Sequence, residues 1–97
     1  MLNEIKVNTV IIGAGISGLS AAHFLSKKSN DFLILESQNQ VGGIIQTVRK
    51  NDFICENGPN TVLLNNEAII EILKDCGLWD SINYPIESSN KNRFVLN

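Results

Sequence analysis

A chain of 97 residues has the length of one small domain or of part of a larger one, and 43% hydrophobic content is ordinary for a folded protein. The formal net charge is −2 and the charged residues are scattered, so neither a nucleic-acid stripe nor a polybasic membrane patch is indicated. Cys55 and Cys76 form no CxxC pair and have no histidine at metal-ligand spacing, which predicts reduced thiols, a cytoplasmic location and no metal site.

The first predicted element is a strand over residues 7–12, a β-branched and almost continuously apolar run of the kind that a parallel sheet buries on both faces. A helix is expected from about residue 17 to residue 28. Residues 10–25 contain no formally charged residue, but glycines, serines and a histidine interrupt them, and a membrane span needs roughly 20 apolar residues. We therefore expect internal core and no transmembrane segment, while peripheral contact with a membrane stays open.

Between this strand and this helix lies the sequence Gly-Ala-Gly-Ile-Ser-Gly, which has the spacing G-x-G-x-x-G. In that context Gly13 permits a tight turn, Gly15 lets the backbone approach a pyrophosphate, and Gly18 lets the helix and the strand pack closely. Helix N-termini meet anionic charge with N–H groups and the helix dipole, and residues 7–26 contain no lysine or arginine. We expect a dinucleotide to bind its pyrophosphate here, at Gly13, Ala14, Gly15, Ile16, Ser17 and Gly18.

A second predicted strand, residues 32–35, ends at Glu36, and the order strand, helix, strand with a short return loop predicts a parallel βαβ unit. Glu36 lies 18 residues after Gly18 (36 − 18), near the spacing of about 20 at which a carboxylate accepts from the ribose hydroxyls of an adenosine. A carboxylate there repels a 2′-phosphate, so FAD or NAD fits and NADP does not. The alternative is a solvated acid at a strand end beside an ordinary glycine turn.

The loop after Glu36 contains Gly42 and Gly43, and the first of them lies six residues after Glu36 (42 − 36). These glycines place main chain without side chains beside the crevice in which the dinucleotide is expected to bind. For this pair alone a flexible turn is the alternative. Its relation to Glu36 favours FAD over NAD. Residues 44–50 and 53–55 are predicted as short strands joined by a turn at residues 50–52.

Farther along the chain, apolar residues at i, i+3, i+4 and i+7 predict a helix with one apolar face, formed by Ile69, Ile72, Leu73 and Cys76. Asn65-Asn66 offers an N-cap for this helix, and Gly77 offers its C-terminal stop. Residues 78–82 are expected to add a helical turn and residues 85–92 to form a loop. Residues 94–97 have strand character, and we expect the chain to be truncated there.

Several segments resemble known flavoproteins. The glycine turn with its flanks (residues 10–22), the Leu-Glu-Ser at 35–37 and the Val-Gly-Gly at 41–43 are similar to the N-terminal FAD-binding region of flavin amine oxidases and their relatives. Within that group, residues 45–49, the Glu-Asn-Gly-Pro stretch at 56–62 and the Asn-Lys-Asn-Arg stretch at 90–96 resemble oxygen-dependent protoporphyrinogen oxidases. The resemblance covers nearly the whole chain from Val7.

The resemblance implies an α/β fold in which residues 1–97 form the incomplete N-terminal part of a Rossmann-like FAD-binding domain, truncated before the substrate domain and without a second domain. It implies an FAD-dependent oxidoreductase of haem biosynthesis that oxidises protoporphyrinogen IX to protoporphyrin IX, with oxygen as the acceptor. The fragment alone is expected to be inactive. Three alternatives stay open: oxidation of coproporphyrinogen III to coproporphyrin III, another amine-oxidase-like flavoprotein, and a nucleotide-binding fragment without catalysis.

The resemblance also implies residue roles. Glu36 and Ser37 would hold the adenosine ribose, and Gly43 and Ile44 would lie on the phosphate side of their loop. The flavin ring region would be formed by Gly58, Pro59, Asn60 and Thr61. No catalytic residue is implied, because in flavoenzymes of this kind the protein positions and tunes the cofactor. Many amine oxidases have arginine where this chain has Ile44, so the phosphate charge is expected to be met by backbone and helix dipole.

Overall fold

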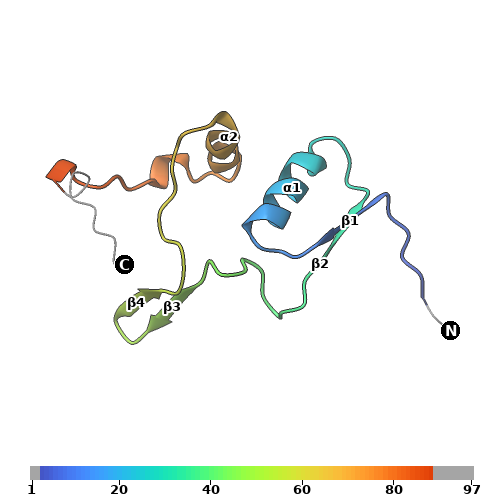
Figure 1. Ribbon diagram of the computed structural model, residues 1–97, viewed down its shortest axis with the longest axis horizontal. Helices are drawn as coiled ribbons and strands as arrows, with labels where there is room; N and C mark the ends of the chain where they lie inside the picture. The colour runs from blue at the N-terminus through green and yellow to red at the C-terminus, as the bar shows by residue number, and fades with distance from the viewer. Residues whose placement is uncertain (1–2, 89–97) are drawn as a thin grey trace, which may run out of the picture. The chain divides into compact units, whose positions relative to one another are not determined.

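The computed structural model describes residues 3–88, which form two compact units, one ending at Leu63 and one beginning at Leu64. The first unit contains β1 (Thr9–Ile12), α1 (Ile16–Ser26), β2 (Phe32–Leu35), β3 (Thr47–Lys50) and β4 (Phe53–Glu56). The second contains α2 (Glu67–Asp75) and the 3₁₀ helix η1 (Trp79–Ser81). Figure 1 shows these elements along the chain.

The first three elements form the predicted βαβ unit. β1 and β2 pair in parallel, with Thr9 opposite Phe32 and Ile12 opposite Leu35, and α1 connects them (Figure 1). Two parallel strands need a crossover connection, which the helix supplies. The α/β class and the Rossmann-like arrangement predicted from the sequence are therefore confirmed.

The predicted burial of the first strand on both faces is wrong for this chain. Along β1, Thr9 and Ile11 are half-buried, whereas Val10 is exposed and Ile12 is 86% exposed. The alternation arises because successive side chains point to opposite faces of a sheet and a single helix can cover only one of them. The buried hydrophobic residues among those described are small, Ala14 and Ala22.

α1 begins one residue earlier and ends two residues earlier than predicted. At its C-terminal end the N–H groups of Lys27 and Lys28 donate to carbonyls three residues back, at 3.3 and 2.9 Å, so the last turn tightens into 3₁₀ geometry. Beyond it the Ser29 hydroxyl accepts from the N–H of Asp31 at 3.0 Å. This local bond competes with continued helix and leads the chain into β2.

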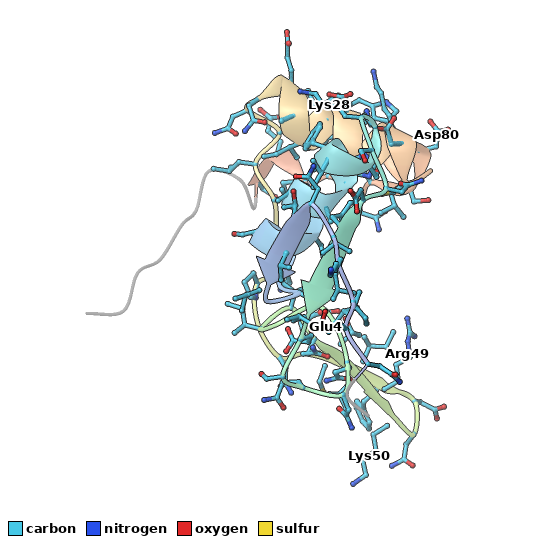
Figure 2. All side chains as sticks on the ribbon, turned by 90° about the vertical axis from the view of Figure 1, so that its right-hand side faces the viewer. Glu4, Lys28, Arg49, Lys50 and Asp80 are labelled. Atoms are coloured by element: carbon cyan, nitrogen blue, oxygen red, sulfur yellow. The ribbon has the colours of Figure 1, made fainter. Side chains whose placement is uncertain are left out.

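β3 and β4 form an antiparallel hairpin in which Thr47 pairs with Glu56 and Lys50 with Phe53. Both strands were predicted, but β3 begins at Thr47, three residues later than expected, because the N–H of Ile45 donates to the Gly42 carbonyl at 3.0 Å and closes a turn there. Every residue of the hairpin strands is exposed. In Figure 2 the labelled side chains of Arg49 and Lys50 extend outward from β3.

The second unit follows its sequence signals closely. The Asn66 side chain caps α2 by accepting from the N–H of Ile69 at 2.9 Å. At the other end, Gly77 has φ +72° and its N–H donates to Lys74 O at 3.1 Å, while Leu78 N–H donates to Leu73 O at 2.8 Å. These two bonds make a Schellman motif, which satisfies carbonyls that the helix end leaves open.

The expected helical turn after Leu78 is confirmed as η1. The loop predicted over residues 85–92 is wrong at Glu87 and Ser88, which are helical; the remainder of that prediction lies outside the described residues. The strand predicted at residues 94–97 and the similarity at residues 90–96 also lie outside them.

Within residues 3–88, every helix is too short or too polar to cross a membrane. The same residues contain no cluster of three or more histidine, cysteine or acidic side chains that could hold a metal ion. Cys55 and Cys76 are both free thiols on exposed residues.

Replacing Asn66 by alanine should lower the free energy of unfolding by about 1 kcal/mol, because the N–H of Ile69 loses its acceptor. Urea denaturation measures the difference. Asn66→Asp is the matched control, since aspartate caps a helix as well as asparagine does. An equal loss of stability in both variants would contradict the capping role.

Candidate functional site

The glycine turn that joins β1 to α1 is tied to the end of the neighbouring strand. Gly13 follows β1 directly and has φ +98°, a conformation that favours glycine. Its N–H donates to the Leu35 carbonyl at 2.7 Å. The turn therefore begins where β1 and β2 both end, at the carboxyl edge of the parallel pair, where open α/β sheets bind ligands.

The third glycine of the motif packs backbone against backbone. A Cβ added at Gly18 would overlap the Gly13 carbonyl oxygen, and it would lie 3.3 Å from Cγ2 of Ile11. No side chain can occupy that space without a shift of the main chain. The predicted role of Gly18 in close packing of helix and strand is confirmed.

The N-terminus of α1 is open to a ligand. Gly15 is its N-cap residue, in extended conformation, and no side chain caps the helix there. A Cβ added at Gly15 would meet nothing within 4 Å among residues 3–88 apart from its chain neighbours, so within the described residues there is open space in front of this glycine. N–H groups at such an end carry partial positive charge and are available to an anion.

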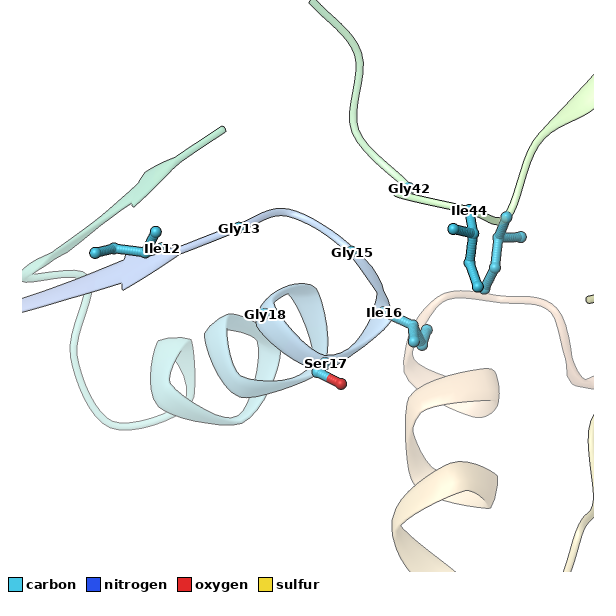
Figure 3. A pocket seen from close by; sticks show the side chains of 9 residues that line it. Ile12, Gly13, Gly15, Ile16, Ser17, Gly18, Gly42 and Ile44 are labelled. Carbon is cyan, nitrogen blue, oxygen red and sulfur yellow. The ribbon is translucent and has the colours of Figure 1, made fainter. Parts of the chain in front are cut away.

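A pocket of about 320 Å³ lies at this helix end (Figure 3). In the figure the loop that carries Gly42 and Ile44 faces the turn that carries Gly15 and Ile16. The residues lining the pocket are glycines, isoleucines and one serine: Ile12, Gly13, Gly15, Ile16, Ser17, Gly18, Gly42, Ile44 and Ile45. None of them is charged, so the lining can attract an anion only through backbone N–H groups, the helix dipole and the Ser17 hydroxyl.

The loop after β2 lies directly against the glycine turn. The N–H of Gly42 donates to the Ala14 carbonyl at 2.8 Å. A Cβ added at Gly43, which has φ +59°, would lie 3.2 Å from the Cα of Gly15. The crevice shared by the two glycine segments, which the sequence predicted from the spacing to Glu36, is present.

Glu36 is held at the end of β2 by main-chain donors. Its Oε1 accepts from the N–H of Ala14 and its Oε2 from the N–H of Gln38, both at 2.9 Å. These hydrogen bonds lower the pKa of Glu36 below its usual value of 4.5, and the bond from Gln38 has a larger effect than the bond from Ala14. A carboxylate has about four acceptor positions, so it can still accept from ribose hydroxyls.

The predicted site residues fall into three groups. Six of them line the pocket: Gly13, Gly15, Ile16, Ser17, Gly18 and Ile44. Four others do not line it but connect to residues that do: Ala14 and Gly43 along the chain, Glu36 through its bond with Ala14, and Ser37 through its bond with Glu36. Ala14 is 1% exposed, and its N–H and carbonyl are both bonded within the chain, so its part in the site is to connect segments.

The third group, Gly58, Pro59, Asn60 and Thr61, is exposed and lies outside the pocket lining, and its predicted contact with a flavin ring stays a prediction. Three lining residues, Ile12, Gly42 and Ile45, were absent from the predicted site. Gly42 directly precedes Gly43, which was predicted as a site residue. The two isoleucines carried no chemical signal, and only the fold brings them to the helix end.

Comparison with known proteins adds independent information. Residues 11–76, more than half of the chain, match the family described as NAD(P)-binding Rossmann-like domain. The matched segment includes the glycine turn, Glu36 and the Gly42 loop.

Curated relatives carry the names of porphyrinogen oxidases. The chain is 36% identical over 83 residues to coproporphyrinogen III oxidase of Bacillus subtilis, covering 79% of this chain and 18% of that protein. It is 34% identical over 91 residues to a chloroplastic protoporphyrinogen oxidase of Nicotiana tabacum, covering 94% and 16%. With coproporphyrinogen III oxidase of Staphylococcus aureus the identity is 42% over 77 residues, covering 77% and 16%. The resemblance seen in the sequence is confirmed, and the chain spans less than a fifth of these relatives' length.

The two kinds of glycine in the turn should respond differently to alanine. Gly18→Ala should lower the free energy of unfolding by about 1 to 3 kcal/mol, because the new methyl group overlaps main-chain atoms of Gly13. Gly15→Ala should lower it by less than about 1 kcal/mol, since its Cβ meets open space. Urea denaturation compares them, and equal losses would contradict the packing described.

The lowered pKa of Glu36 predicts a pH dependence of stability. Because the folded-state pKa is below the unfolded value, the stabilisation is fully present above the unfolded pKa and is lost as the pH falls through the lower, folded-state pKa. The difference in unfolding free energy between the unchanged protein and Glu36→Gln should therefore be constant near neutral pH and shrink in acid, below about 4.5. Denaturation over a pH series measures it; a difference that persists in strong acid would contradict the prediction.

Proposed function

The chain belongs to the family of NAD(P)-binding Rossmann-like domains, and we propose that it holds FAD on this fold within an enzyme that oxidises a porphyrinogen. The observation that carries the proposal is the pocket at the uncapped N-terminus of α1, closed on one side by the Gly42 loop. Similarity to relatives named as porphyrinogen oxidases supports the substrate class.

The residues at the pocket fit the diphosphate and ribose of FAD. The open space at Gly15 would admit the pyrophosphate, whose charge the N–H groups at the start of α1 would meet. Glu36, fixed by its two main-chain donors, would accept from the ribose hydroxyls and disfavour a 2′-phosphate. Ser37 adjoins Glu36. Gly43, which has no side chain, and Ile44, whose side chain is apolar, would lie on the phosphate side.

We infer that the contribution of this chain to the reaction is binding and orientation. FAD, when bound, supplies the redox chemistry, which removes electrons from the substrate and transfers them to oxygen. Gly13–Gly18 would anchor one end of the cofactor, and Gly58 to Thr61 are proposed to lie toward its flavin ring. Residues 1–97 are proposed as the N-terminal portion of the FAD-binding domain, with the substrate bound by other parts of a longer protein.

Protoporphyrinogen IX is the proposed substrate, and oxidation would give protoporphyrin IX in haem biosynthesis. Coproporphyrinogen III is a second candidate, favoured by the similarity to the two bacterial relatives that are named for it. The two compounds differ in their number of propionate groups, and the described residues that line the pocket include no basic side chain that would distinguish them.

Cofactor identity is tested on the full-length protein. It should purify with a flavin absorbance band in the visible range, and Gly15→Val should abolish the band because the side chain fills the space at the helix end. Gly77→Ala, which changes a glycine outside the pocket, is the control and should retain the band. A colourless protein that binds NAD instead would overturn the assignment of FAD.

Substrate identity is tested by aerobic assays with each porphyrinogen. Oxidation restores the conjugated, fluorescent porphyrin, so fluorescence should rise with at least one of the two substrates. Faster reaction with coproporphyrinogen III would select the second candidate. No rise with either substrate, in a protein that holds FAD, would overturn the proposed function.

A further inference from the structure

The segment after β4 contacts the main chain of the loop that lines the pocket. A Cβ added at Gly58 would overlap the carbonyl oxygen of Ile44, and it would lie 3.0 Å from the carbonyl carbon of Ile44 and 3.7 Å from the nitrogen of Ile45. All of these are main-chain atoms of one peptide group. Gly58 therefore lies directly against the Ile44–Ile45 peptide, and both of these isoleucines line the pocket.

The requirement for glycine at this position is one of space. The φ angle of Gly58 is not positive, unlike those of Gly42 and Gly43, so its backbone conformation suits other residues as well. A neighbouring side chain could rotate away from a new methyl group, but a carbonyl oxygen moves only with its peptide. A substitution at Gly58 must therefore displace the chain at Ile44, at Gly58 or at both.

Gln46 connects the contact between Gly58 and Ile44 to the turn that contains Gly42 and Gly43. Its main-chain carbonyl accepts from the N–H of Asn57 at 2.7 Å, which holds the segment beside Gly58 in place. Its side-chain Nε2 donates to the Gly43 carbonyl at 2.9 Å, and its Oε1 accepts from Gln40 at 3.0 Å. Gln46 thus links the loop on both sides of Ile44.

The loop that Gly58 and Gln46 contact, residues 42–45, is itself bonded to the glycine turn. The N–H of Ile45 donates to the Gly42 carbonyl at 3.0 Å, and the N–H of Gly42 donates to the Ala14 carbonyl at 2.8 Å. A displacement of the Ile44–Ile45 peptide would strain the first of these bonds and move one wall of the pocket. Gly58 is connected to Ala14 through Ile44, Ile45 and Gly42, and each of these links is a main-chain contact or hydrogen bond. No side chain on this path can therefore absorb the displacement.

We propose that Gly58 and Gln46 are positioning residues that hold the Gly42–Ile45 wall against the glycine turn, and that this placement sets the affinity for the dinucleotide. The proposal rests on the proposed function for the identity of the ligand. It gives Gly58 a role independent of contact with a flavin ring, since the residue acts through Ile44.

The first measurement needs no cofactor. Hydrogen exchange in the full-length protein, followed for the amides of Gly42 and Ile45, should be faster in Gly58→Ala than in the unchanged protein by about tenfold, which corresponds to about 1.4 kcal/mol of lost protection. Gln46→Ala, which removes the bond to Gly43 without adding any atom, should show a smaller increase of the same kind. It also covers the case in which Gly58→Ala does not fold.

The second measurement is FAD affinity at a temperature at which each variant is folded by circular dichroism. The dissociation constant should rise by about tenfold in Gly58→Ala and by a few-fold in Gln46→Ala, and the visible band of bound flavin should shift. Gly77→Ala is the control for a general loss of stability. Its φ of +72° makes alanine strained, but it lies outside the pocket and should leave both exchange and affinity within about twofold.

The outcomes separate the two hypotheses. Faster exchange at Gly42 and Ile45 in the variants supports the positioning role even if the unchanged protein binds no FAD, a result that would overturn the cofactor assignment alone. Unchanged exchange and unchanged affinity in both folded variants overturn the positioning role and leave the proposed function intact. Equal changes in exchange and affinity in Gly77→Ala would also overturn the positioning role, because they would show that general destabilisation causes the changes.

Discussion

Ala14 is the point at which three segments of the first unit are joined through the main chain. Its N–H donates to the Glu36 carboxylate, and its carbonyl accepts from the N–H of Gly42. The residue itself is 1% exposed, and its bond to Glu36 is partly buried. The turn after β1, the end of β2 and the Gly42 loop therefore share one buried connection, and the pocket forms around it.

Three close main-chain contacts give this arrangement its shape. Gly18 lies against the Gly13 carbonyl, Gly43 against the Cα of Gly15, and Gly58 against the Ile44 carbonyl. In each case the partner atom belongs to the backbone, so it cannot move aside as a side chain would. At Gly18 and Gly58 glycine is needed because two chain segments pass within contact distance, and at Gly43 the close approach of 3.2 Å is accompanied by a φ of +59°; none of these reasons involves a ligand.

The pocket combines an apolar lining with an uncapped helix end. Four isoleucines line it, and none of its lining residues within 3–88 is charged. These isoleucines are exposed, so the donors that an anion would meet at the pocket are the main-chain N–H groups at the start of α1. Ile44, which lines the pocket, carries no charge, so an anion there would be met by main-chain donors. Among the described residues of the site, Glu36 carries a carboxylate, which accepts from the N–H groups of Ala14 and Gln38.

Local patterns in the sequence determined the elements of this protein and the centre of its site. The order strand, glycine turn, helix and strand, the acid at the end of β2 and the capped helix at residues 67–75 all follow from interactions within a few residues, which is why they could be predicted. The burial of β1 could not, because it depends on how many layers cover the sheet, and α1 covers only one face. The membership of Ile12 and Ile45 in the pocket and the contact of Gly58 with Ile44 were decided by the tertiary structure alone, since they depend on main-chain segments that meet only after the βαβ unit and the hairpin have folded.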